Sequence, residues 1–375
     1  MRIPFGNPKI GPIAREHLEK AIALNWASEG ENVKKFERLF AEKFGYKHAI
    51  AVSSGTDADI VANTVLYDLG AKRGDEIITP ALAFVATANS ILAAGFTPKF
   101  VDIRVDTLNL DPAKIEAAIT PRTRAIQVVH TMGKPCDMDS ILAIAKARKL
   151  TVIEDACEAH GATYKGRYVG TLGDMGAFSF FAAHLVYSGE GGMVVTNSDR
   201  LAEICRSVKS HGRPAGSNFF DFQRMGYNSK MNDLEAALGI EGTINFDDTF
   251  NRRKTHLKKL LGLVKDLEDR AHFLVEEEHE KISPHAFSLV LKNEKHNRDK
   301  LYGYLESKEI QCKTLFGCLP TQQKAFTWMG HKQGEFPAAE FVGRNGLHFG
   351  VHQSLTSEDI DYVSQQLHAY FEKLR

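Results

Sequence analysis

The 375-residue chain lacks the features that mark disulfide-rich, zinc-binding or membrane-spanning proteins. Its five cysteines are scattered, with no CxxC pair and no Cys/His group at zinc-ligand spacing, so we predict reduced thiols rather than a disulfide framework or a zinc site. Its apolar stretches are short or interrupted by charge, and its first residues lack the apolar segment of a signal peptide. We therefore expect a cytoplasmic protein without a membrane segment.

The chain also lacks an excess of charge of either sign. It has 47 basic and 47 acidic residues, so its formal net charge is zero. A protein that covers nucleic acid or an anionic membrane needs a broad basic surface, and we expect neither partner. With 43% hydrophobic and 25% charged residues, the composition is that of a globular protein, and the length allows about two domains.

Short β-branched runs alternate with helical periodicity between about residues 48 and 200. Repeated strand–helix–strand units predict an α/β fold with a mostly parallel central sheet flanked by helices. Gly, Pro or Asp residues bound the predicted strands. These strands are 48–52, 76–79, 98–102, 124–129, 151–154, 177–181 and 193–196.

The pattern changes after about residue 240. It predicts a charged helix over 252–270, a strand over 285–291 and a helix over 299–307, and a last helix opens at Thr356–Asp359 with a capping-box-like sequence. We expect a large α/β domain over 1–240, which includes an N-terminal helix, and a small α+β domain over 241–375.

A glycine-rich dinucleotide motif is also missing. No GxGxxG follows the early strands, and the spacing in Gly189–Gly192 does not match it, so hydride transfer on a nicotinamide is disfavoured. In an open parallel sheet, ligands bind beyond the carboxyl ends of the strands. The residues that carry chemistry are therefore expected at those ends.

Two strand ends carry polar groups suited to an anionic or aromatic ligand. Ser53–Ala58 follows one strand and opens a helix, so its N–H groups and hydroxyls could cradle a phosphate, although a plain helix cap explains it equally well. Asp155 ends a central strand, where a buried carboxylate needs a donor or cation. The protonated nitrogen of a pyridine ring is one such partner, and a structural cap is the alternative.

Two other strand ends carry an aromatic ring and an imidazole. Phe84 could stack on a flat ring or belong to the core. Ser179 and His184 end a strand shortly before Gly189–Gly192, and both could face the crevice. His184 could act as a base, although a lone histidine is usually structural.

Taken together and in order, these pieces resemble the DegT/DnrJ/EryC1/StrS family of sugar aminotransferases, which has the pyridoxal phosphate-dependent transferase fold of type I. The likeness covers 53–58, 80–87, 130–139, 154–162, 178–196, 225–228 and 350–355. The resemblance implies pyridoxal 5'-phosphate or pyridoxamine 5'-phosphate as cofactor, a nucleotide-linked ketosugar as substrate and glutamate as amino donor. It also implies a homodimer.

The resemblance assigns cofactor contacts to Ser54, Gly55, Thr56, Phe84, Asp155, Glu158, Ser179 and Asn228. The hydroxyl and glycine residues would bind the phosphate. Phe84 would stack on the pyridine, Asp155 would pair with the ring nitrogen, and Glu158 would lie near the ring hydroxyl. Asn228 would reach the phosphate of the neighbouring subunit, which makes a dimer necessary for a complete site.

One departure from the family motif decides the expected chemistry. The family has a lysine, which binds the cofactor covalently, where this chain has His184. Sugar 3-dehydratases that act on nucleotide-linked 4-keto-6-deoxyhexoses, such as GDP-4-keto-6-deoxymannose, form a branch with histidine here. The resemblance therefore implies C3 dehydration with Asp155 and His184 as the catalytic groups, and His211 and Arg213 as substrate contacts. An imidazole with its ordinary pKa near ~6.5 can accept a proton at neutral pH.

Two other functions remain open at this point. One is amino transfer to a similar sugar, by a natural enzyme or a lysine-to-histidine variant, and the other is a non-catalytic relative that binds the cofactor or the sugar nucleotide. A second dehydratase type carries an iron–sulfur cluster on clustered cysteines. Cys157 matches one position near that cluster, but the close C-terminal group of cysteines is absent. We therefore expect no cluster and no iron–sulfur reductase partner.

Overall fold

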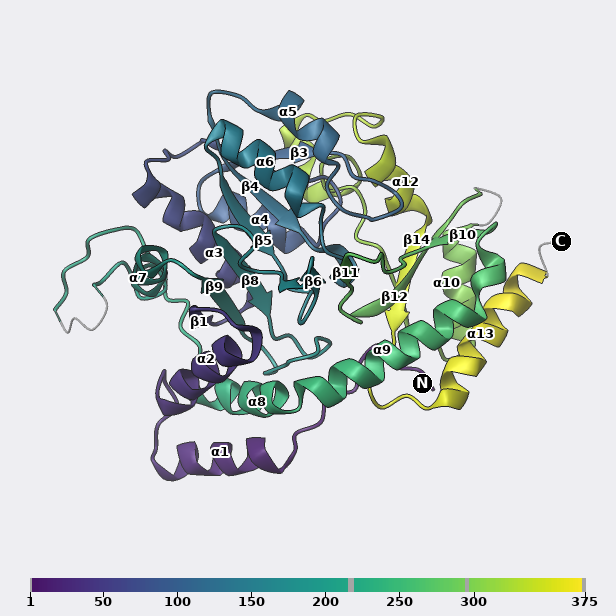
Figure 1. The fold of residues 1–375 in the computed structure, drawn as a ribbon, viewed down its shortest axis with the longest axis horizontal. Coiled ribbons are helices and arrows are strands. Elements are labelled where there is room, and N and C mark those ends of the chain that lie inside the picture. The colour runs from purple at the N-terminus through teal and green to yellow at the C-terminus, as the bar shows by residue number, and fades with distance from the viewer. Residues whose placement is uncertain (1, 215–218, 294–296, 373–375) are drawn as a thin grey trace.

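The computed structural model describes residues 2–214, 219–293 and 297–372, and a seven-stranded sheet forms its centre (Figure 1). The strands run in the order β1-β9-β8-β5-β4-β2-β3. Only β9 is antiparallel to its neighbours, so the predicted mostly parallel sheet is confirmed. The strands are β1 (His48–Val52), β2 (Glu76–Pro80), β3 (Thr97–Val101), β4 (Thr123–Val129), β5 (Thr151–Asp155), β8 (Met175–Ser179) and β9 (Gly192–Thr196).

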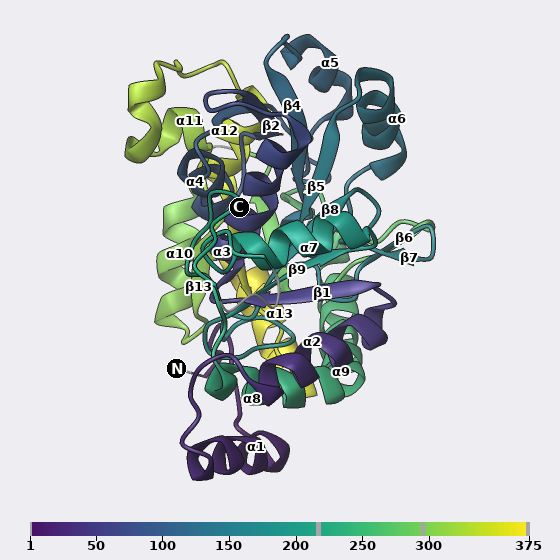
Figure 2. The same ribbon diagram turned by 90° about the vertical axis from the view of Figure 1, so that its left-hand side faces the viewer.

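Helices cover both faces of this sheet, because successive side chains of each strand point to opposite faces. Ile126 and Val152 pack into a core with α2, α6 and α8, whereas Ala125 and Ile153 pack into a core with α3, α4 and α7. In both views α1 lies at the outer edge beside α8 (Figures 1 and 2). These helices are α1 (Pro12–Ala23), α2 (Glu31–Phe44), α3 (Gly55–Thr64), α4 (Val85–Ala93), α5 (Ile115–Ala118), α6 (Met138–Arg148), α7 (Asp199–Val208) and α8 (Asp233–Ile244).

A second, antiparallel sheet follows in the order β10-β12-β14-β13. Its own core contains residues of α9, α10 and α13, and Ile3 near the N-terminus joins that core. The elements are α9 (Phe246–Leu263), β10 (Ala271–Phe273), β12 (Ala286–Leu291), α10 (Arg298–Ser307), β13 (Cys312–Thr314), α11 (Leu319–Gln322), α12 (Pro337–Asn345), β14 (Gly346–Gly350) and α13 (Ser357–Glu372). The division into two domains at residue 240 stays a prediction.

Short elements complete the described chain. A three-stranded sheet pairs β11 (Glu280–Lys281) with β6 (Thr163–Tyr164) and β7 (Arg167–Tyr168). The 3-10 helices are η1 (Val65–Leu69), η2 (Pro112–Lys114), η3 (Thr131–Gly133), η4 (Lys265–Leu267) and η5 (Lys324–Met329). Within the described ranges, no helix is long and apolar enough to cross a membrane.

Two predicted elements are displaced by two or more residues at both ends: the helix expected over 252–270 spans Phe246–Leu263, and the strand expected over 177–181 spans Met175–Ser179. The charged helix expected over 252–270 ends at Leu263, because the chain turns through η4 to bring Ala271 into the second sheet. The strand expected over 177–181 ends at Ser179, after which the chain forms a turn closed by a hydrogen bond from His184 N to Phe181 O (2.9 Å). His184 therefore lies on a turn beyond the strand.

The end of β5 is anchored by Glu154, which is fully buried. Its Oε2 accepts hydrogen bonds from His130 Nε2 (3.0 Å) and Gly170 N (2.7 Å), and its Oε1 accepts one from Gly173 N (2.7 Å). Because every donor is buried or half-buried, the carboxylate fixes the position of the neighbouring Asp155 relative to β4 and the loop after β7.

Replacing Glu154 with alanine is expected to lower the free energy of unfolding by ~3 kcal/mol or more, because three donors, including the buried His130, lose their hydrogen-bond acceptor. Urea denaturation followed by circular dichroism measures this. The control is Glu116→Ala, which removes an ion pair with Arg148 whose two side chains are more than half exposed. Its expected cost is below ~1 kcal/mol. Equal costs for the two substitutions would contradict the anchoring role of Glu154.

Candidate active site

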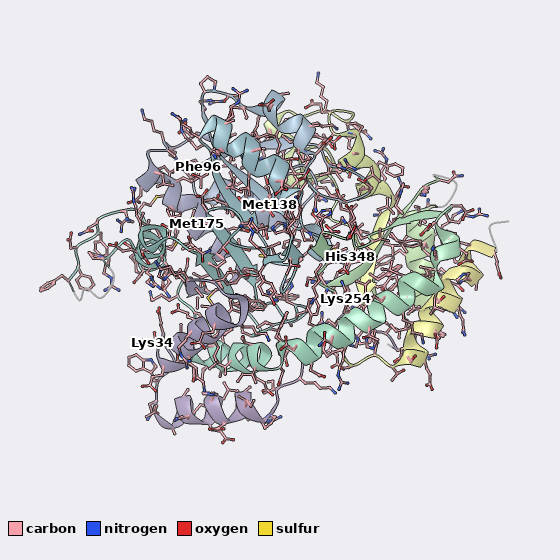
Figure 3. The ribbon with its side chains drawn as sticks, viewed as in Figure 1. Lys34, Phe96, Met138, Met175, Lys254 and His348 are labelled. Carbon is pink, nitrogen blue, oxygen red and sulfur yellow. The ribbon has the colours of Figure 1, made fainter. Side chains whose placement is uncertain are left out.

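A pocket of 790 Å³ lies between the carboxyl ends of the parallel strands and the second sheet. It brings together eight predicted site residues: Ser54, Gly55, Thr56, Phe84, Asp155, Glu158, Ser179 and His184. The opposite wall is formed by His285, Lys313 on β13 and His348 on β14. Of these three, His348 is labelled in Figure 3.

The start of α3 is built to receive an anion. Ser54 caps the helix by accepting from Asp57 N (3.0 Å), and its carbonyl accepts from Ala58 N (3.0 Å). The amides of Gly55 and Thr56 remain to meet a ligand. Gly55 is required by close packing, because a Cβ there would lie 2.5 Å from Cβ of Ser179. Ser54 can therefore cap the helix while the amides of Gly55 and Thr56 bind a ligand, and this arrangement fits a phosphate.

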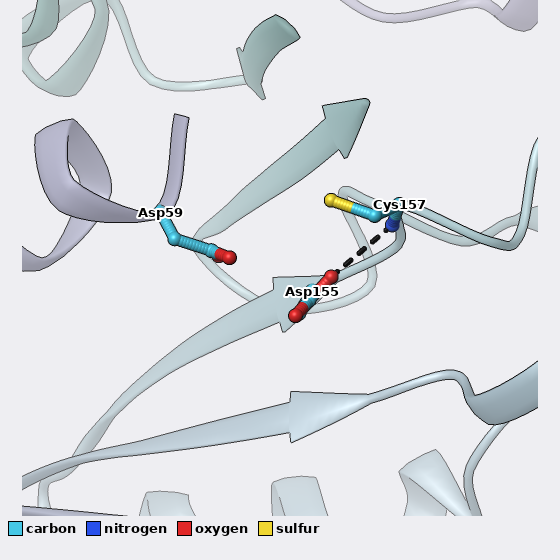
Figure 4. A group of neighbouring side chains, drawn as sticks. All are labelled: Asp59, Asp155 and Cys157. Atoms are coloured by element: carbon cyan, nitrogen blue, oxygen red, sulfur yellow. Dashed lines mark hydrogen bonds between the residues drawn. The ribbon is translucent and has the colours of Figure 1, made fainter. Parts of the chain in front are cut away.

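Asp155 lies at the end of β5 with both carboxylate oxygens bonded to donors. Thr87 Oγ1 donates to Oδ2 (2.7 Å), and Cys157 N donates to Oδ1 (3.2 Å; Figure 4). Asp155 is 6% exposed and lines the pocket. Because its neighbours only donate, this carboxylate suits a further positively charged donor, and the protonated nitrogen of a pyridine ring fits that requirement.

Asp59 on α3 is a second carboxyl group at this point and was not predicted. Side-chain atoms of Asp59, Asp155 and Cys157 lie within 4.8 Å of one another (Figure 4). Burial, followed by the negative charge of Asp155, raises the pKa of Asp59 well above its ordinary value, although Gln127 Nε2 donates to its Oδ1 (2.8 Å). The raised pKa favours the protonated form of Asp59, so this second carboxyl group can lie beside Asp155 without the repulsion of two like charges.

His184 follows β8 and is 9% exposed. Its Nδ1 is buried and has no hydrogen-bond partner among the residues that the structure describes, so Nε2 is the ring nitrogen that can meet a ligand. Burial, and then the charges of Arg253 and Lys313, lower the pKa of His184 to about 3. The imidazole is therefore neutral throughout the physiological range, but it is a weaker base than the ordinary pKa used in the sequence analysis implied.

Further imidazoles surround His184, and sequence patterns had not identified them. Its ring centroid lies 5.1 Å from that of His285 and 5.7 Å from that of His160. His285 Nε2 lies 3.5 Å from Glu158 Oε1, while Met132 N donates to Glu158 Oε2 (2.7 Å). Burial raises the pKa of Glu158 to about 8, so its carboxyl group is mostly protonated at neutral pH and can donate a hydrogen bond.

The lysines of the described chain do not replace the missing family lysine at the end of β8. Lys313 alone among them lines the pocket, from the opposite wall, with its Nζ 4.3 Å from the ring centroid of Phe5. Lys209 is buried against Glu29 and Ala51 O, and Lys165 pairs with Asp139 on the surface. At position 184, where the resemblance places the family lysine, this chain has an imidazole.

Three predicted residues lie outside the pocket of this chain. Asn228 pairs with Ser210 in an isolated bridge and is exposed, and its side chain accepts from Lys230. His211 is exposed and has a left-handed backbone (φ 62°), and Arg213 donates to Ser210 Oγ (3.3 Å). Their roles at a cofactor or substrate stay predictions, since a single chain does not bring them to the site.

The phosphate-binding helix start and the aspartate at the end of a central strand, on a mostly parallel sheet, define an enzyme of the pyridoxal phosphate-dependent class. The chain belongs to the DegT/DnrJ/EryC1/StrS aminotransferase family, whose model matches residues 8–368. Its cofactor is pyridoxal 5'-phosphate or pyridoxamine 5'-phosphate. The predicted family, fold class and cofactor are thereby confirmed.

The relatives include both aminotransferases and dehydratases. The chain is 35% identical to GDP-perosamine synthase of Caulobacter vibrioides over 96% of each protein. It is 33% identical to the dTDP-4-dehydro-2,6-dideoxy-D-glucose 3-dehydratase of Saccharopolyspora spinosa over 95% of this chain and 83% of that protein. The structure of E. coli GDP-4-keto-6-deoxy-D-mannose-3-dehydratase with bound hydrated PLP matches with a TM-score of 0.89 and 28% identity, over 97% of this chain and 99% of the other.

Proposed function

We propose that the protein removes the C3 hydroxyl of a nucleotide-linked 4-keto-6-deoxyhexose, with His184 as the base and glutamate as the amino donor. The observation that carries this proposal is that an imidazole, rather than a lysine, follows β8 in the pocket. The names of the S. spinosa relative and of the E. coli structure support it.

The residues of the pocket fit the cofactor at each of its polar groups. When bound, the cofactor supplies a conjugated ring that can take up and return an electron pair. The amides of Gly55 and Thr56, with the hydroxyl of Ser179, would hold its phosphate, while the hydroxyl of Ser54, which donates to Asp57 Oδ2 (3.0 Å), would shape the helix start around it. Phe84 is 59% exposed, so its ring is free to pack against a flat ligand.

Three side chains would govern the protons. Asp155 would keep the ring nitrogen protonated, because its carboxylate oxygens accept hydrogen bonds and the raised pKa of the neighbouring Asp59 favours the neutral form of that group. The neutral His184 would accept a proton from C4′ of the bound cofactor and deliver it to the C3 hydroxyl of the sugar, so that this oxygen leaves as water. The protonated Glu158 would donate to the ring hydroxyl or its oxyanion.

Amino transfer to a similar nucleotide sugar is the second candidate, and by name the comparisons support it better than dehydration. GDP-perosamine synthase is among the relatives, and the family itself is named for aminotransferases. The pocket accommodates this reaction as well, except that position 184 offers an imidazole where the family has an amine.

A non-catalytic role is disfavoured, because Thr56, Asp155 and Ser179 all line one pocket. We further propose that a homodimer completes the site through Asn228.

Incubation with glutamate and GDP-4-keto-6-deoxymannose is expected to release ammonia and to yield a sugar without its C3 hydroxyl. Mass spectrometry of the product and a coupled ammonia assay measure this, and dTDP- and CDP-linked sugars identify the preferred nucleotide. His184→Asn is expected to lower the rate at least ~1000-fold, as loss of an acid–base group does, while the cofactor stays bound.

The matched control is His279→Asn, at a histidine whose side chain is 41% exposed and outside the pocket. It is expected to retain full turnover. An amino sugar in place of the deoxygenated product would identify the second candidate function. Full turnover in His184→Asn would remove His184 from the mechanism.

A further inference from the structure

Arg253 of α9 is a buried cation that has no carboxylate partner within 4.0 Å among the described residues. Its side chain is 3% exposed. Its three hydrogen bonds end on neutral oxygens: Nη1 donates to Ala183 O (3.1 Å), Nη2 to His184 O (3.2 Å) and Nε to Gln353 Oε1 (2.9 Å). The side chain thus joins the turn after β8 to the segment that follows β14.

Burying the guanidinium of Arg253 without a carboxylate partner costs more free energy than a purely structural contact requires. Buried arginines are usually paired with a carboxylate, because removing the charge from water is expensive. Burial lowers the pKa of Arg253 to about 10, so the guanidinium still carries its charge at neutral pH. The planar fork of donors matches two successive carbonyl oxygens, which a single ammonium group cannot do with the same geometry.

The charges that act on His184 itself are positive, those of Arg253 and Lys313, although Asp155 lines the same pocket. The groups that face His184 are His160 after β5, His285 before β12, Arg253 on α9 and Lys313 on β13. Glu158 reaches this set only through His285 and is mostly protonated. Protonation of the His184 ring would therefore place a second positive charge beside the guanidinium without a carboxylate to compensate it.

We propose that Arg253 is a positioning residue for His184, which holds the peptide carbonyls on both sides of the imidazole in place and puts a positive charge beside the ring. The inference rests on the proposed function only in taking His184 as the base. Its test uses the cofactor-free protein and needs no turnover, so it is decided even if the reaction is amino transfer.

Three variants separate the charge of Arg253 from its hydrogen bonds. Arg253→Gln removes the charge, Arg253→Lys retains it without the fork, and Gln353→Glu retains Arg253 but supplies a carboxylate where the neutral amide now accepts. The imidazole of His184 is followed by NMR of protein labelled in its histidine rings, from pH 8 down to the lowest pH at which the fold persists. The signal is assigned by its loss in His184→Asn.

In Arg253→Gln and in Gln353→Glu, the protonated fraction of His184 at pH 5 is expected to rise about tenfold, which corresponds to an upward shift of about one pH unit. In Arg253→Lys the protonated fraction of His184 is expected to match that of the wild type, because the lysine retains the positive charge. If Arg253→Gln does not fold, Gln353→Glu decides the question. A folded Gln353→Glu variant in which the titration of His184 is unchanged would overturn the proposal and leave Arg253 a structural link.

Discussion

Replacement of Asp155 with asparagine is expected to lower turnover at least ~1000-fold, which is at the upper end of the effect of losing one preorganised electrostatic group. Both oxygens of Asp155 already accept hydrogen bonds, from Thr87 and from the amide of Cys157. Asparagine would turn an NH2 group toward one of these donors or toward the ring nitrogen of the cofactor. It would also remove the charge that keeps this nitrogen protonated. Product formation at saturating substrate measures the loss.

The matched control for this substitution is Asp59→Asn. The two carboxyl groups lie side by side, but burial, followed by the charge of Asp155, raises the pKa of Asp59 well above its ordinary value and favours its protonated form. An amide has nearly the shape of a protonated carboxyl group, and its oxygen can still accept from Gln127 Nε2. We therefore expect a loss of less than ~10-fold, an amount typical of a conservative change beside a site. Equal losses in the two variants would show that the charge is shared, and would contradict the assignment to Asp155 alone.

The parallel sheet could be predicted because short β-branched runs alternate with helical periodicity along the chain. The runs at 124–129 and 151–154 have this character, and both lie within strands of the structure. The helix predicted over 252–270 was too long, because the charged residues after Leu263 are as compatible with a solvated turn as with a helix. Only the pairing of Ala271 with β12 ends the helix, and that pairing is a tertiary contact.

The candidate site could be predicted where function depends on strand ends, as for Asp155, Ser179 and Thr56, which line the pocket. Site residues could not be predicted where they lie within a helix rather than at a strand end. Asp59 lies inside a helix, and Arg253 lies in a helix of another core. Their importance follows from what packs beside them, and a local pattern in the sequence does not contain that information. The position of Asn228 outside the pocket has the same cause, since the resemblance assigns it to the phosphate of the neighbouring subunit.

Replacement of His184 with lysine is expected to convert non-covalent binding of pyridoxal 5'-phosphate into covalent attachment at position 184. A lysine here would lie beside Arg253 and across the pocket from Lys313, near a protonated Glu158. Burial beside cations lowers the pKa of an amine, so a larger share of it is uncharged and nucleophilic at neutral pH. Borohydride reduction followed by peptide mass spectrometry is expected to find a pyridoxyl adduct at residue 184.

His184→Met is the matched control, because methionine has a comparable reach without an amine, and it is expected to give no adduct. The wild type is expected to give none either, since Lys313 approaches from the opposite wall with its Nζ over the ring of Phe5. If the wild type carried the adduct on Lys313, the cofactor would already have an amine anchor. Lys313 would then supply the amine that position 184 lacks. The same pocket would favour amino transfer rather than dehydration.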